Sequence, residues 1–92
     1  MFGLIPYHEI KENEVFLIEN CSSIHTFFMK FNIDVVFTDK KGKIIKLEKD
    51  MKPWRILNGG LKAGHVYEWT CGSISKYHIK EGKDIKPWLQ KN

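Results

Sequence analysis

Three polar residues, His25, Asp34 and Glu68, stand inside otherwise apolar or aromatic segments of this sequence. A carboxylate in such a segment either faces solvent or costs several kcal/mol unless it is paired. If Asp34 and Glu68 faced one concave surface, they could bind a cation or a polar ligand, or shift one another's pKa for acid–base chemistry. The structural alternative is that Asp34 accepts backbone or lysine hydrogen bonds while Glu68 lies on a solvent-exposed face.

The two cysteines, Cys21 and Cys71, carry no C-x-x-C spacing. A zinc site would require both of them to meet His25 and His65 from separate segments. A nucleophilic Cys21–His25 pair would need a thiolate within hydrogen-bond reach and an oxyanion partner, which no motif supplies. Structural thiols are the simpler interpretation, and we expect neither a metal nor a cofactor.

Large aromatic residues could line a groove for a ligand or a peptide, with Arg55 at its rim; the candidates are Trp54, Tyr67, Trp69 and Trp88. Tryptophan and arginine are favoured at the centres of interaction surfaces. Core packing explains Trp69 equally well. Trp54 and Trp88 each adjoin a proline in segments of weak strand character, so we expect these two to make surface contacts.

The formal net charge of +4 comes from fifteen basic residues, of which only Arg55 is arginine. Specific nucleic-acid readers depend on the planar fork of arginine. Lysines spread over strands and turns keep sheet edges soluble instead. Nucleic-acid binding therefore ranks third, behind a binding module and a small enzyme.

The first residues lack a basic region followed by an apolar run of about 7–15 residues, as in a signal peptide. No stretch approaches the roughly 20 apolar residues of a membrane helix. We therefore expect a cytoplasmic protein with reduced thiols and no membrane partner.

Hydrophobic periodicity divides the chain into short elements. It predicts a helix or turn within residues 6–12, strands at 15–18, 24–29, 33–38, 43–48, 61–70 and 84–86, and a short helix at 72–78 with Ser73 as its N-cap. Segment 15–18 is expected to be buried, and Pro53 places its neighbourhood in a loop or an edge. Asp39 and Gly42 predict a hairpin between 33–38 and 43–48.

Strand alternation assigns faces within these elements. Residues 33, 35 and 37 share one face and residues 34, 36 and 38 the other, while 63, 65, 67 and 69 lie opposite 66 and 68. With 92 residues, the chain can form a single hydrophobic core. We predict one α+β domain, β-dominated, whose six or so short strands form a strongly bent sheet or a partly closed barrel.

Several sequence blocks resemble the domain of unknown function 192 family. They are an early Gly-Leu element at 3–4, an aromatic-Met-Lys block at 24–30, an apolar-Asp-apolar strand at 33–39, a connection at 52–55, and an apolar-Glu-apolar strand at 66–69 followed by Gly72. The resemblance implies a compact, mainly β fold and brings no established activity, substrate or cofactor. The chain departs from the family in lacking an extra first strand, and in carrying Gly-Lys-Asp at 82–84 where a Gly-Asp pair is usual.

These features favour a non-enzymatic module that binds a small ligand or a protein through the candidate residues His25, Asp34, Trp54, Arg55 and Glu68. No nucleophile elbow, phosphate loop or metal spacing is present. The enzymatic alternative is a small hydrolase or isomerase that uses Asp34 and Glu68, with its carboxyl groups within about 10 Å of each other. A missing first strand would leave an unpaired edge, so we also expect a homo-oligomer.

Overall fold

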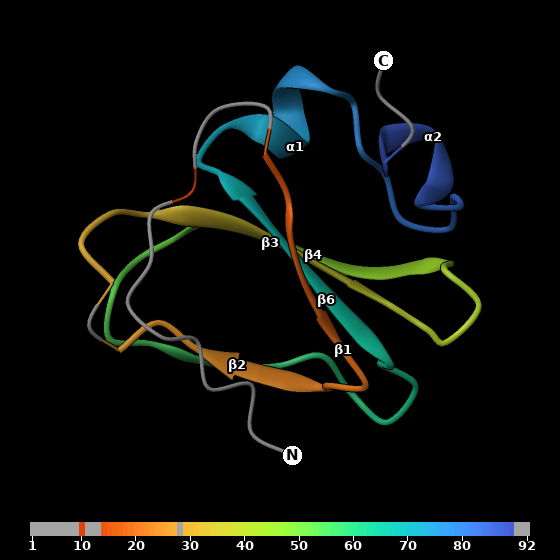
Figure 1. Ribbon diagram of the computed structural model, residues 1–92, viewed down its shortest axis with the longest axis horizontal. Coiled ribbons are helices and arrows are strands. Elements are labelled where there is room, and N and C mark those ends of the chain that lie inside the picture. Colours follow the sequence, from red (N-terminus) through yellow and green to blue (C-terminus); the bar gives the residue numbers. More distant parts are fainter. Residues whose placement is uncertain (1–9, 11–13, 28, 90–92) are drawn as a thin grey trace.

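The computed structural model describes residues 10, 14–27 and 29–89, which form two antiparallel sheets and two short helices (Figure 1). The strands are β1 (Phe16–Glu19), β2 (Ser23–His25), β3 (Ile33–Thr38), β4 (Ile44–Met51), β5 (Ile56–Asn58) and β6 (His65–Thr70). The helices are α1 (Ser73–Lys76) and α2 (Lys86–Leu89). This arrangement confirms the β-dominated class. The sequence left open a strongly bent sheet or a partly closed barrel, and the strands form no closed barrel within the described ranges.

The larger sheet has the strand order β1-β6-β3-β4, and the smaller sheet pairs β2 with β5. A first core cluster includes Ile24 of β2 and Ile33, Val35 and Phe37 of β3, and therefore lies between the two sheets. A second cluster packs the opposite face of the large sheet against the C-terminal segment, which contains α1 and α2. The large sheet is thus the middle layer of the molecule, and its two faces have different neighbours.

The hairpin of β3 and β4 forms as predicted. The Asp39 carboxylate accepts the backbone N–H groups of Lys41 and Lys43, both at 2.9 Å, and these bonds hold the pKa of Asp39 below its usual range. Gly42 takes the left-handed conformation at φ 95° and donates its N–H to the Asp39 carbonyl. Local turn chemistry therefore sets this connection.

Several predicted elements are shorter or differently placed. The strand expected at 24–29 ends at His25, and the strand expected at 61–70 begins at His65. β1 is not fully buried, because it is an edge strand and Leu17 is 42% exposed. The helix or turn expected at 6–12 lies outside the described residues apart from Ile10.

The C-terminal third also departs from expectation. Gly72, at φ 94°, takes the N-cap position of α1, and the Ser73 hydroxyl instead pairs with that of Thr70 at 3.1 Å. The strand expected at 84–86 is reduced to a single bridge between Lys43 and Asp84, after which α2 begins. Across the described segments, no helix is long and apolar enough to cross a membrane.

Candidate functional site

A buried threonine organises the loop between β4 and β5. The Thr26 hydroxyl donates to the Lys52 carbonyl at 2.7 Å and accepts the Arg55 N–H at 2.9 Å. The Thr26 backbone N–H donates to the Arg55 carbonyl, and the Thr26 carbonyl accepts the Trp54 N–H at 3.0 Å. Residue 26 thus binds the loop instead of extending β2, and both ends of the segment 52–55 are fixed.

We expect Thr26→Val to destabilise the chain by about 1–3 kcal/mol, because it leaves the Arg55 N–H and the Lys52 carbonyl without the buried hydroxyl. Valine has nearly the same shape, so the change removes hydrogen bonds and little packing. Urea unfolding measures the stability, and the indole N–H resonance of Trp54 reports the loop. Thr38→Val is the control, since it removes a different hydroxyl bond, to the Asp39 carbonyl. A Trp54 resonance that moves equally in both variants would contradict the local role of Thr26.

The clamped loop presents Trp54 to solvent. Its backbone is left-handed, with φ at 65°, and its side chain is 58% exposed. The ring stacks on Phe27 with centroids 5.4 Å apart, and Phe27 lies 4.6 Å from the His25 ring. A continuous row of three rings therefore runs from the end of β2 to the exposed loop.

The pairing of β2 with β5 decides which side chains join this row. Ile24 pairs with Leu57, and both pack in the core between the sheets. His25 pairs with Ile56, so both lie on the outer face, where Ile56 is 66% exposed. We call His25, Phe27, Trp54 and Ile56 the aromatic surface.

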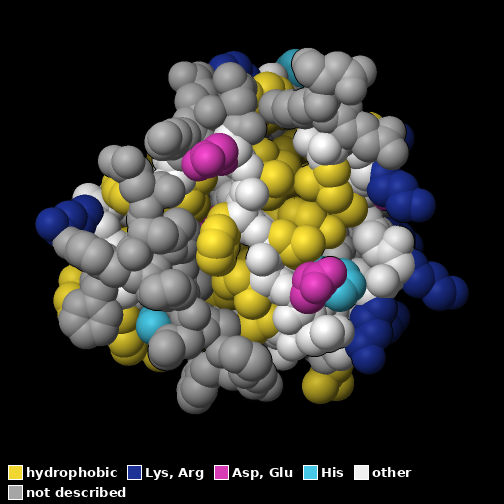
Figure 2. Space-filling view, in the orientation of Figure 1, with side chains coloured by type: hydrophobic (Ala, Val, Ile, Leu, Met, Phe, Trp, Pro, Cys, Tyr) yellow, Lys and Arg dark blue, Asp and Glu magenta, His cyan; other side chains and the backbone are white. Residues whose placement is uncertain are grey.

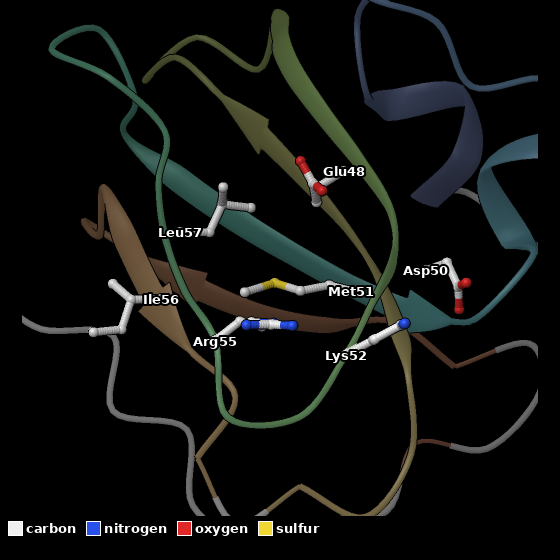
Figure 3. A pocket seen from close by; sticks show the side chains of 7 residues that line it. All are labelled: Glu48, Asp50, Met51, Lys52, Arg55, Ile56 and Leu57. Atoms are coloured by element: carbon white, nitrogen blue, oxygen red, sulfur yellow. The ribbon is translucent and has the colours of Figure 1, made fainter.

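A pocket of about 320 Å³ adjoins the aromatic surface at Ile56 and lies between β4 and β5 (Figure 3). We call it the β4–β5 pocket; its lining residues are Glu48, Asp50, Met51, Lys52, Arg55, Ile56 and Leu57. The Met51 side chain crosses its centre, with Lys52 and Arg55 on one side and Glu48 on the other. Its size is at the lower end of the range for small-molecule sites, and its lining is both apolar and charged.

Asp34 does not itself line this pocket, and its carboxylate has two backbone partners, one of which is the lining residue Asp50. Asp34 is 1% exposed; its Oδ1 accepts the Asp50 N–H at 2.9 Å and its Oδ2 accepts the Ile74 N–H at 2.8 Å. The β3–β4 register shifts between Ile33 and Val35, so the first bond satisfies an amide at an irregular point of the ladder. The second bond fixes the first turn of α1. The carboxylate therefore ties β3, β4 and α1 together.

Glu68 lies on the other face of the same sheet. It is opposite Val35 in the register, and Val35 belongs to the core between the sheets, whereas Asp34 is opposite Trp69 in the second core. Glu68 is 0% exposed, and burial raises the pKa of its carboxyl to about 8. The structural alternative is therefore right for Asp34, which accepts backbone hydrogen bonds, and wrong for Glu68, which is not on a solvent-exposed face.

His25, Asp34 and Glu68 consequently lie in three different layers. His25 belongs to the aromatic surface, Glu68 to the core between the sheets, and Asp34 to the α1 side of the large sheet. A mechanism that pairs the two carboxylates does not fit this geometry, because the sheet itself separates them. Of the five predicted site residues, the fold brings together His25, Trp54 and Arg55.

The two thiols have structural partners. Cys21 is buried and donates to the Ser23 carbonyl at 2.9 Å. Cys71 is exposed and donates to the Asp50 carboxylate at 3.1 Å, and this carboxylate raises the pKa of the Cys71 thiol to about 11. The thiol therefore stays protonated at neutral pH, unlike a nucleophilic cysteine. Among the residues that the structure describes, no group of three or more His, Cys, Asp or Glu side chains is placed to hold a metal ion.

The remaining aromatic candidates belong to the second core. Tyr67 and Trp69 stack with centroids 6.1 Å apart beneath the C-terminal segment. Trp88 packs against the same core and donates its indole N–H to the Tyr77 carbonyl at 2.7 Å. These contacts anchor α2 to the second core, so Trp88 does not make the surface contact that we expected.

Sequence reasoning missed Thr26, Phe27, Met51 and Ile56 as parts of the site. A signal was present at residue 26, where a hydroxyl interrupts an apolar run. Its partners lie 26 and 29 residues further along the chain, so only the folded structure identifies them.

Fold and site together define a small two-sheet β domain with an exposed aromatic surface beside an amphipathic pocket. The chain belongs to the DUF192 family, described as an uncharacterised ACR, whose model matches residues 1–87. It is 34% identical over 90 residues to a UPF0127 protein of Thermococcus gammatolerans, covering 94% of this chain and 58% of that protein. A UPF0127 protein of Thermococcus kodakarensis is 33% identical over 67 residues, which are 73% of this chain and 41% of the relative.

A crystal structure of a protein of unknown function from Novosphingobium aromaticivorans has a similar fold, with a TM-score of 0.73 at 15% identity. The similarity covers 83% of this chain and 59% of that one. This chain thus spans about half the length of the relatives it matches.

Proposed function

We propose that this chain is a non-enzymatic binding module whose binding site combines the aromatic surface with the β4–β5 pocket. One observation carries the proposal: the carbonyl of buried Thr26 accepts the N–H of the exposed Trp54, whose backbone is left-handed. Arg55 follows Trp54 in the chain, and His25 belongs to the same row of rings through Phe27.

The backbone at Trp54 argues that its side chain serves an external contact. A bulky residue at positive φ costs of the order of 1 kcal/mol or more, and glycine would avoid that cost. Trp54 is 58% exposed, so core packing does not require an indole there. A strained, rigidly held aromatic residue at the surface is typical of a contact position.

The surrounding chemistry suits an amphipathic partner that carries negative charge. The rings of His25, Phe27 and Trp54 offer stacking, and the pocket offers apolar contact through Met51. Arg55 adds a guanidinium group that can pair with a carboxylate or a sulfonate.

The test uses the aromatic sulfonate 8-anilinonaphthalene-1-sulfonate as a probe. We expect the intact chain to bind it in the native state, and we expect Trp54→Gly to raise its dissociation constant at least about tenfold. The stability of that variant should change by less than about 1 kcal/mol, because relief of backbone strain offsets the lost stacking on Phe27. Fluorescence titration and urea unfolding measure the two quantities.

Leu61→Ala is the matched control, since Leu61 is also a large exposed apolar residue, at 106% exposure, but lies outside the site. It should leave probe binding unchanged. Equal weakening in both variants, or a native chain that does not bind the probe, would contradict the proposal.

The two other functions have less support. A hydrolase or isomerase that pairs Asp34 with Glu68 is not proposed, because the two residues face different layers. For nucleic-acid binding, Arg55 is the sole arginine of the chain. On the face seen in Figure 2, lysine and arginine side chains lie along the margins, most of them at the right, while hydrophobic side chains occupy the centre.

A further inference from the structure

We infer that the partner of this site is an extended polypeptide segment that adds as a strand to the outer edge of β5 and fills the β4–β5 pocket. The inference rests on the proposed function and names the class of its partner. It is supported by the direction of the β5 backbone groups, by the pocket beside them and by the charges at one end of the pocket.

The backbone of β5 alternates between its two edges. The Arg55 carbonyl accepts the Thr26 N–H, and the Gly59 N–H donates to the Ser22 carbonyl at 2.7 Å. The backbone groups of Arg55 and Gly59 therefore point toward β2. By the two-residue period, Ile56 and Asn58 direct their backbone groups to the opposite edge. The Asn58 carbonyl accepts the Lys46 ammonium of β4 at 2.8 Å, as this direction requires.

That opposite edge faces β4 across the pocket. β4 ends the order of the large sheet and β5 ends that of the small sheet, so within the described segments the two strands approach without forming a ladder. Ile56 lines the pocket between them, and its N–H and carbonyl point toward that gap. An extended segment lying there can pair with Ile56 as an added strand.

Side chains of an added strand alternate between two faces, so every second one can enter the pocket. The pocket offers Met51, which is 5% exposed, and Leu57 of the first core as apolar contacts. Valine or a residue of similar size suits this lining, and β-branched residues favour the extended conformation.

The charges favour acidic residues at the other positions. Lys52 and Arg55 lie on one side of the pocket, and the chain carries a net charge of +4. The Asp50 carboxylate is engaged by the Asn32 amide at 2.7 Å and by the Cys71 thiol. Glu48 is on the far side of the pocket from Lys52 and Arg55. A valine–glutamate alternation therefore matches the apolar lining and the basic side together.

The experiment compares three short synthetic peptides on the intact chain: one of alternating valine and glutamate, the same peptide N-methylated on alternate amides, and one of alternating valine and lysine. We expect the first peptide to bind. N-methylation removes the donors of a strand and keeps the side chains, so it should weaken binding at least about tenfold, and lysine should weaken it similarly. Bound peptide should also slow hydrogen exchange of the Ile56 amide.

Two variants test whether the peptide binds at the outer edge of β5. Ile56→Pro removes the outward N–H and should abolish peptide binding. Leu61→Ala changes another exposed apolar residue, which lies outside the site, and should leave peptide binding unchanged. If the proline variant does not fold, the methylated peptide still tests strand addition. Equal affinity for the methylated or the lysine peptide overturns the inference, as does exchange protection on β1 in place of Ile56. Self-association that protects Ile56 without peptide also overturns it, since a second copy would then be the partner.

The inference and the proposed function fail separately. A chain that binds the aromatic sulfonate through Trp54 but no peptide retains the proposed binding module and loses the polypeptide partner. A chain that binds neither probe loses both.

Discussion

The stability of this protein should fall between about pH 4.5 and pH 8, and replacing Glu68 with glutamine should remove that fall. Burial raises the pKa of Glu68 from 4.5 to about 8 in the folded chain. Below pH 4.5 both the folded and the unfolded states carry the proton. Between pH 4.5 and 8 only the folded state holds it, so the free energy of unfolding falls as the pH rises, and above pH 8 the loss is complete.

The size of this loss is roughly 3–5 kcal/mol across the interval, a large part of the stability of a small domain. Glutamine has nearly the same shape and does not titrate there, so the variant should lack this decline. It should exceed the native chain in stability at pH 8–9. The test compares how the free energy of unfolding of each protein changes with pH. A difference in packing between glutamate and glutamine is the same at every pH, so it does not affect this slope.

Urea unfolding at pH steps from 4 to 9 measures the slope for both proteins. Glu81→Gln is the control, because Glu81 is an exposed carboxylate outside both cores, and this variant should decline like the native chain. A native chain whose stability stays constant from pH 5 to 8 would show that Glu68 ionises in the folded state without penalty.

Replacing Asp34 with asparagine should lower the stability of this protein, whereas Glu68→Gln should raise it at pH 8–9. The two changes should be similar in size. Both Asp34 oxygens accept backbone N–H groups, from Asp50 and Ile74, in a site that is 1% exposed. Asparagine keeps one acceptor oxygen and turns an NH₂ donor toward the other N–H group. We expect a loss of about 2–4 kcal/mol, because a buried charge-assisted bond is removed and two donors are left facing each other.

Thermal unfolding should show this as a fall in Tm of about 10 °C or more for a chain of this size. Hydrogen exchange of the Ile74 amide should accelerate more than that of amides in β6. Asp84→Asn is the control, since the carboxylate of Asp84 is exposed and accepts the Lys86 N–H at 2.8 Å, so this variant should change the Tm little. An unchanged Tm in Asp34→Asn would show that the Asp34 carboxylate does not stabilise the junction of β3, β4 and α1.

The Asp34 variant also separates scaffold from site. Asp34 lies on the α1 side of the large sheet, whereas the aromatic surface lies beyond the small sheet. Below its Tm, Asp34→Asn should therefore bind the aromatic sulfonate with the affinity of the native chain. Loss of binding in the fully folded variant would show that the Asp34–Asp50 bond supports the β4–β5 pocket, and it would contradict this separation of scaffold from site.

Elements whose geometry depends on near neighbours in the chain could be predicted from the sequence. Asp39 and Gly42 specify the β3–β4 turn through bonds that span four residues or fewer. The two-residue period correctly divided β3 and β6 into alternating faces, because the pleat requires it. It also indicated that His25, Asp34 and Glu68 occupy unusual positions for polar residues.

What each of those faces packs against depends on how the strands pair in the folded chain. The register places Glu68 opposite Val35 and Asp34 opposite Trp69, and this offset of one residue sends the two carboxylates to different cores. One carboxylate then becomes a hydrogen-bonded clamp, and the other a buried group with a raised pKa. Alternation along one strand cannot set its register with a strand that is distant in the sequence, as β6 is from β3.

The same reason explains the site. Thr26 holds Trp54 and Arg55 through bonds that span 28 and 29 residues, and the β4–β5 pocket exists because two strand edges approach without pairing. The tryptophan, the arginine and the histidine could be identified from the sequence as candidate binding residues, because residues of these types are common in binding sites. Their assembly on one surface depended on how the small sheet packs on the large one, because long-range packing, and not local propensity, sets that arrangement.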